Sequence, residues 1–189
     1  MRPKKESGLM KYVCIILYIA LLLFLFGCSS DVEFTTTIER SVHIHSTEPT
    51  YYAERLVDMS QRDDLLRYKD EITGVNVEKI FIKITENNSQ PNTRIYASVS
   101  VADSNQSAND AVTVAQTSGL PLSEVLGTEI EIELDPQGKE KLNQYIHDLT
   151  NFKIFIFGSA EPASSQNVPL DFTAKIIIRV RIHAKVKFI

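Results

Sequence analysis

Tryptophan is absent from the 189 residues, and glycine is scarce, with seven residues in all. Without tryptophan, any surface that stacks sugar rings has to rely on tyrosine. The few glycines form no phosphate-cradling loop and no nicotinamide fingerprint, and the chain has neither a Gly-x-Ser-x-Gly elbow nor a His-Glu-x-x-His pair. We therefore expect a protein that is not an enzyme and that needs no cofactor or metal.

An apolar run long enough to span a membrane is also missing. Residues 12–26 form an uncharged run of 15 residues, whereas a spanning helix needs about 20. The run follows a basic head that contains Arg2, Lys4, Lys5 and Lys11. A basic head before a short apolar run is typical of the signal peptide of an exported protein.

The tetrapeptide Leu25-Phe26-Gly27-Cys28 closes this run and resembles the lipobox of bacterial lipoproteins. In that family the cysteine thiol is lipidated and the chain is cut directly before it. The resemblance therefore implies a signal peptide over residues 1–27 and attachment to a membrane through lipid on Cys28. Several acyl chains would hold firmly, because one chain alone gives only marginal binding.

The residues after Cys28 also resemble sorting signals of lipoproteins. Position 29 is Ser rather than the Asp that resembles an inner-membrane retention signal, and Asp31 and Glu33 resemble the acidic signals of surface lipoproteins. The resemblance implies a place in the cell envelope, with the outer membrane or the cell surface favoured.

Cleavage before Cys28 would leave 162 residues with 16 basic and 23 acidic side chains. This length suits one domain with a proper core. The acidic balance argues against nucleic acid as a partner, which requires a basic footprint. Cys14 would be removed with the signal peptide and Cys28 would be capped by lipid, so cysteine nucleophiles and an internal disulfide are excluded.

Apolar and polar residues alternate along much of the chain after Cys28. We expect a lipidated tether over residues 28–31 and a single domain over residues 32–189. Period-two alternation is typical of half-buried antiparallel strands, while residues 52–59 fit either a short strand or a helical turn. The predicted strands cover residues 32–44, 75–85, 94–102, 111–116, 128–134, 152–158 and 170–189.

Two helix starts interrupt the strands. Ser60 can cap a helix of about nine residues, and Asp135 followed by Pro136 predicts a second helix that runs to about Leu149. The fold class predicted is mostly β: a two-sheet antiparallel sandwich, immunoglobulin-like or related, with two short helices.

This layout resembles a group of uncharacterised β-sandwich surface lipoproteins from Bacteroidota-type bacteria. The shared features are the lipobox, an alternating first strand, a Leu-Tyr-Lys stretch that leads into a strand, and a long last strand. Here the last three lie at residues 32–44, 66–84 and 172–186. The resemblance implies a fold and a location rather than an activity.

The last strand carries basic side chains on one face. They form a candidate anion-binding face made of Lys175, Arg179, Arg181, His183, Lys185 and Lys187. Such a face suits lipopolysaccharide phosphate, an acidic glycan or lipid headgroups. The alternative is pairing across strands with the acidic residues of other alternating segments, Glu33, Glu39, Glu129, Glu131 and Glu133.

Two further pairs are candidates for binding. Tyr51 and Tyr52 form the tandem aromatic pair of the chain and are candidates for stacking a glycan. His43 and His45 share one strand face about 7 Å apart, but two imidazoles fall short of the three or four ligands of a zinc site. We therefore expect solvated histidines and no metal.

The expected function is that of an envelope-anchored lipoprotein with a non-catalytic β-sandwich that binds a partner or has a structural role. The partner would be an envelope protein or a glycan. The alternative is a carbohydrate-binding accessory of a surface glycan-uptake system, or an adhesin.

Overall fold

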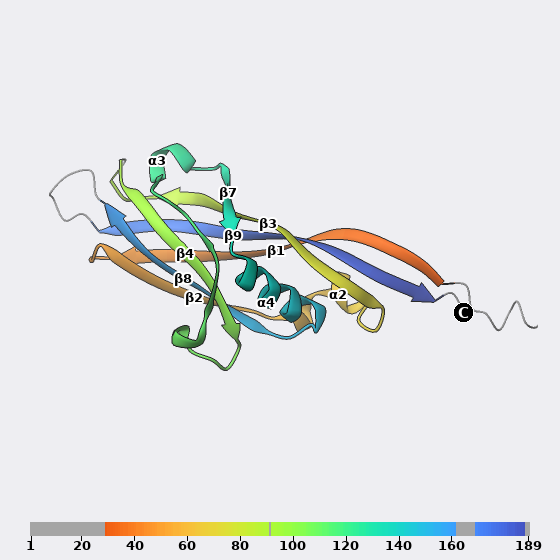
Figure 1. The fold of residues 1–189 in the computed structure, drawn as a ribbon. Helices are drawn as coiled ribbons and strands as arrows, with labels where there is room; N and C mark the ends of the chain where they lie inside the picture. The colour runs from red at the N-terminus through yellow and green to blue at the C-terminus, as the bar shows by residue number, and fades with distance from the viewer. Residues whose placement is uncertain (1–28, 91, 162–168, 188–189) are drawn as a thin grey trace, which may run out of the picture.

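A computed structural model describes residues 29–90, 92–161 and 169–187 of the chain (Figure 1). The predicted signal peptide and Cys28 lie outside the described residues. Within this part of the chain, no helix is long and apolar enough to cross a membrane.

The described chain is built mainly of antiparallel strands, which confirms the mostly-β prediction. The strands are β1 (Ser29–Ser46), β2 (Thr50–Val57), β3 (Ile72–Asn87), β4 (Arg94–Asp103), β5 (Val112–Gln116), β6 (Leu120–Pro121), β7 (Glu129–Leu134), β8 (Phe152–Glu161) and β9 (Leu170–Lys187). The helices are η1 (Met59–Gln61), α2 (Asp63–Leu66), η2 (Ala108–Asp110), α3 (Leu122–Val125) and α4 (Pro136–His147).

The strands follow the order β1-β9-β3-β7-β5-β4-β8-β2, with β6 paired to β4 at the side. Only two residue pairs, Ala115 with Leu134 and Gln116 with Glu133, join β5 to β7. These pairs make one continuous sheet from a half that contains β1, β9, β3 and β7 and a half that contains β5, β4, β8 and β2. The division into the two sheets of a sandwich stays a prediction.

The sheet is curled, so that its first strand β1 and its last strand β2 lie side by side (Figure 1). Two arginines join them: Arg40 Nε donates to the Leu56 carbonyl at 3.2 Å, and Arg55 Nε donates to the Ser41 carbonyl at 3.3 Å. We call this contact the arginine seam. It covers backbone groups that would otherwise be left open at two sheet edges.

The core lies inside the curl. Alternate residues of each strand point inward, so Ile38 of β1, Val77 of β3 and Ile154 of β8 are all buried in one cluster. Helix α4 adds Leu142 and Ile146 to the same cluster. This distribution follows directly from the period of two in the sequence.

The helix predicted at Asp135 and Pro136 is confirmed as α4, in which Asp135 accepts hydrogen bonds from the backbone of Gln137 and Gly138. The helix of about nine residues predicted after Ser60 is wrong, because only η1 and the four-residue α2 form there. Asp58, not Ser60, accepts the capping hydrogen bond.

Pairing with β9 ends the helical region early. The backbone of Lys185 donates to the Glu71 carbonyl at 2.8 Å, and Ile72 pairs with Ala184. Contacts between distant segments thus override the local preference for helix.

The first residues of β1 differ from the predicted tether over residues 28–31. Ser29, Ser30 and Asp31 already belong to the strand, and Asp31 pairs with Lys185 of β9. The described chain therefore leaves no free linker between position 29 and the sheet.

Candidate functional site

The basic face of β9 lies beside acidic residues of β1. Lys175 Nζ is 3.0 Å from Glu39 Oε2, and Arg181 donates to Glu33 Oε1 at 3.0 Å. Arg181 also forms an ion pair with Glu78 of β3. The antiparallel register of β1 and β9 places Glu33 and Glu39 beside the basic residues, and the pairing of β3 with β9 brings Glu78 to Arg181.

Arg179 pairs with an acid on a strand that is not adjacent to β9. Its guanidinium donates to Glu129 Oε2 of β7 at 2.9 Å, across β3, and lies 4.3 Å from the centre of the Phe81 ring. Ile177, the apolar residue on this basic face, is buried, as is Phe81. The arginine therefore combines an ion pair with a cation–π contact over an apolar spot on the outer sheet face.

His183 Nδ1 lies 3.5 Å from Glu33, so four basic residues of this face have acidic neighbours. Exposed pairs of this kind contribute about 0.2–1 kcal/mol each. Among the described side chains of the face, Lys185 is the one without an ion pair. Lys187 pairs with Ser29 in the backbone register, and its side chain lies outside the described part. Cross-strand pairing accounts for most of the basic face, and anion binding stays a prediction.

The two tyrosines have different surroundings. Tyr51 is 7% exposed, and its hydroxyl donates to the Tyr96 carbonyl at 3.1 Å. Its ring lies over Gly158, where a Cβ would come within 2.1 Å of the ring. Burial raises the pKa of Tyr51. Tyr51 is therefore unavailable to a sugar, and the stacking prediction falls on Tyr52 alone.

Tyr52 lies on the outer face and is 51% exposed. Its ring centre is 5.4 Å from that of Phe157 and 6.3 Å from that of Phe155, and its hydroxyl donates to Glu54 Oε2 at 2.7 Å. Partial desolvation, followed by the hydrogen bond and the charge of Glu54, raises the pKa of Tyr52 to about 12. The tyrosine is therefore neutral at physiological pH.

These rings belong to a larger surface that the sequence interpretation missed. We call it the aromatic patch, and it consists of Tyr52, Leu56 and Phe157, with the ring of the fully buried Phe155 beneath them. Leu56 is 50% exposed. The signal for the patch is in the sequence: in β8 the inward residues Phe152, Ile154 and Ile156 alternate with Phe155 and Phe157, so the strand is apolar on both faces.

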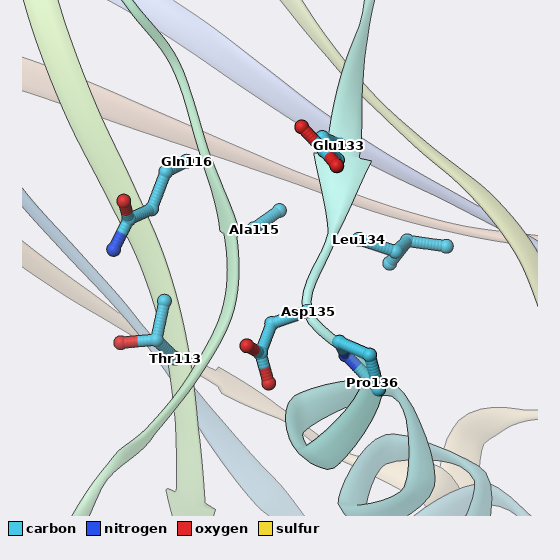
Figure 2. A pocket seen from close by; sticks show the side chains of 7 residues that line it. All are labelled: Thr113, Ala115, Gln116, Glu133, Leu134, Asp135 and Pro136. Atoms are coloured by element: carbon cyan, nitrogen blue, oxygen red, sulfur yellow. The ribbon is translucent and has the colours of Figure 1, made fainter.

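A pocket of about 290 Å³ lies between β5, β7 and the start of α4. Figure 2 shows the side chains that line it. It lies beside the two residue pairs that join β5 to β7, and these four residues belong to its lining. Its lining consists of Thr113, Ala115, Gln116, Glu133, Leu134, Asp135 and Pro136. One Asp135 oxygen is already used to cap α4. Of the described residues that line the pocket, none is His, Cys or Lys, and its ionisable groups are the carboxylates of Glu133 and Asp135.

The histidines on β1 share one carboxylate. Asp171 of β9 lies 3.6 Å from His43 Nε2 and 4.0 Å from His45 Nδ1. His183 of β9 lies beside Glu33 instead. Across the described ranges, no group of three or more His, Cys, Asp or Glu residues is placed to hold a metal ion.

Comparison with known proteins names no family. No family model matches the chain, and no curated protein matches it. A turnip yellow mosaic virus structure has 11% identity over 85% of both chains, with a TM-score of 0.37. A desmodium yellow mottle tymovirus structure has 12% identity over 82% of this chain and 85% of that chain, with a TM-score of 0.35. An infectious bursal disease virus structure, of the Gx strain, has 12% identity over 84% of this chain and 37% of that chain, with a TM-score of 0.32. Likenesses this distant carry no argument about function.

Proposed function

We propose that this chain is a non-catalytic lipoprotein domain, held at the cell envelope by lipid on Cys28, which binds a partner or has a structural role. The observation that carries the proposal is the place of Ser29. This exposed residue begins β1 at the far end of a long pair of strands (Figure 1). A lipidated residue directly before it would leave the folded core undisturbed.

The surroundings of the polar side chains support a role without catalysis. Four residues of the basic face have acidic neighbours. The described lining of the pocket at β5 and β7 lacks an imidazole, a thiol and an amine. In this proposal the two halves of the curled sheet act as the two layers of an immunoglobulin-like sandwich, and the outer membrane or the cell surface is the favoured location.

The test is membrane fractionation of the full chain with one cysteine replaced at a time. Cys28→Ser should move the protein from the membrane fraction to the soluble fraction, because the thiol that accepts the lipid is lost. Cys14→Ser is the matched control, since it removes a thiol inside the apolar run and should leave the protein in the membrane fraction. A Cys28→Ser protein that stays with the membrane would overturn the proposal.

A second candidate function is carbohydrate binding, in a glycan-uptake system or an adhesin. The observation that favours it is the Tyr52 ring, half exposed beside Phe157 and hydrogen-bonded to Glu54. An exposed aromatic face with a carboxylate at its edge suits stacking against a sugar ring that also donates hydroxyl hydrogen bonds.

A glycan array probed with the native protein tests this second function. Tyr52→Ala should abolish the binding of any glycan that the native protein retains. Leu126→Ala is the control, because Leu126 is 49% exposed but lies after α3, away from the aromatic patch. No binding by the native protein at millimolar sugar would remove the candidate.

A further inference from the structure

The strands β1 and β9 extend beyond the rest of the sheet. The pairs between β3 and β9 end at Ile72 with Ala184, whereas β1 continues to pair with β9 through Asp31, Ser30 and Ser29. Figure 1 shows these two strands running out together past the other strands. We call residues 29–31 with residues 185–187 the ribbon tip.

The outer face of the ribbon tip carries a basic side chain without an acidic partner. Lys185 is exposed and forms no ion pair with a described residue, although Asp31 is its partner in the strand register. Further along the same face, Lys175, Arg179 and Arg181 each lie within 3.0 Å of a carboxylate oxygen. Lys185, at the end of this face, is therefore the described basic residue whose ammonium makes no direct ion pair, while Asp31 lies across from it in the register.

The other face of the ribbon near the tip is apolar and partly open. Val32 and Val186 are only partly buried, in contrast to Ile182 further along the strand. The ribbon near the tip thus has valines on one face and a lysine without an ion pair on the other. Such an end suits the boundary region of a bilayer, where apolar side chains meet the acyl chains and a lysine meets the headgroups.

We propose that the ribbon tip rests in the headgroup layer of the membrane, with the Lys185 ammonium against the phosphate of an acidic lipid. This inference rests on the proposed lipid on Cys28. Because Ser29 already belongs to β1, only Cys28 separates that lipid from the sheet, a reach of about 3.5 Å. A contact held so close forms even when its intrinsic affinity is weak, since the anchor keeps its effective concentration high.

The proposal also orients the domain. β1 has 18 residues, which span about 60 Å at roughly 3.3 Å per residue. The loop that follows Ser46 would lie far from the bilayer. Tyr52 lies in the first half of β2, shortly after that loop, so the aromatic patch would be presented to the medium rather than to the lipid.

The absence of tryptophan makes the test direct, because a single introduced tryptophan reports its own depth. Ser30→Trp marks the ribbon tip, and Leu126→Trp marks an exposed site away from it. Each full-length lipidated protein is reconstituted into phosphatidylcholine vesicles with and without phosphatidylglycerol, and quenching by brominated lipid is measured. We expect several-fold stronger quenching at position 30 than at position 126, and stronger quenching when phosphatidylglycerol is present.

Charge variants made in the Ser30→Trp protein test the role of Lys185. Lys185→Gln should remove the dependence on phosphatidylglycerol, and Asp31→Asn should strengthen it. Lys175→Gln is the matched control, because it removes the same charge from a residue that already pairs with Glu39. Equal quenching at positions 30 and 126, or equal effects of Lys185→Gln and Lys175→Gln, would overturn the inference.

Mass spectrometry of the same preparations separates the two proposals. A lipid mass on the N-terminal cysteine together with an unquenched tip refutes the docking of the ribbon tip alone. A chain that starts elsewhere without lipid refutes the proposed anchor and, with it, this inference.

Discussion

Arg179 of β9 donates a hydrogen bond to Glu129 of β7, although β3 lies between their strands. The long side chain of Arg179 crosses the intervening strand β3, and its guanidinium lies over the ring of Phe81. This contact shows how the basic face is compensated within the protein: the acids come from both neighbouring and more distant strands.

We predict a small coupling energy for this pair. Both side chains are more than a third exposed, so a double-mutant cycle with Arg179→Ala and Glu129→Gln should give about 0.2–1 kcal/mol. Chemical denaturation of the four proteins at low and high salt measures it. Arg179→Ala should cost more than Glu129→Gln, because it also removes the contact with the Phe81 ring. Equal costs would show that the ring contact contributes nothing.

Gly158 is predicted to be intolerant of a side chain. A Cβ at this position would lie 2.1 Å from the Tyr51 ring and 2.4 Å from the Tyr96 carbonyl. Gly158→Ala should therefore lower the free energy of unfolding by about 1–3 kcal/mol, the usual cost of overpacking. Gly74→Ala is the control, because its nearest neighbour would lie 3.7 Å away. Similar thermal stability of the two variants would contradict the packing described for Tyr51.

The positions of most strands could be predicted from alternation, because one face of each strand is buried against the same core. The aromatic patch was missed since residues on both faces of β8 are apolar, and alternation carries no information there. The pocket could not be predicted either. It lies where segments distant in sequence meet, and the close approach of α4 to β5, where a Cβ on Gly138 would lie only 2.1 Å from the Thr113 carbonyl, is not visible in the alternation.

Asp64 should make stability depend on pH in the acid range. The hydrogen bond from Arg62, with a further one from Thr36, lowers the pKa of Asp64 to about 2, although partial burial opposes the shift. Because the folded pKa is below the unfolded value of about 3.9, the stabilisation is present above about pH 4 and is lost as the pH falls towards 2.

Asp64→Asn tests this dependence. The side chain of Asp64 is 43% exposed, so solvent screening should limit the effect to less than about 1 kcal/mol at neutral pH. The difference in the free energy of unfolding between the native protein and the variant should shrink between about pH 4 and pH 2. Asp63→Asn is the control, since Asp63 lies beside Asp64 in α2 but forms no side-chain ion pair with a described residue. A constant difference across this range would contradict the assignment.

The arginine seam leads to the last prediction. Arg40 and Arg55 each donate to a backbone carbonyl of the opposite strand, and β1 and β2 are the two ends of the sheet. When both arginines are replaced with alanine, the two carbonyls should bond to water instead, and β1 and β2 should separate. Hydrogen exchange should then rise in β1 and β2 while β3 and β9 stay protected, and open edges should promote association between copies.

Hydrogen exchange with mass readout and analytical ultracentrifugation measure the two effects. Arg94→Ala is the matched control, because Arg94 also donates to a carbonyl, that of Gly119 at 3.1 Å, but lies away from the seam. Arg40→Lys should behave like Arg40→Ala, since a single ammonium lacks the fork with which the guanidinium reaches both the Leu56 and the Glu39 carbonyls. If the double variant kept the association state of the native protein and native exchange in β2, packing of the core alone would hold the curl closed, and the arginines would be dispensable.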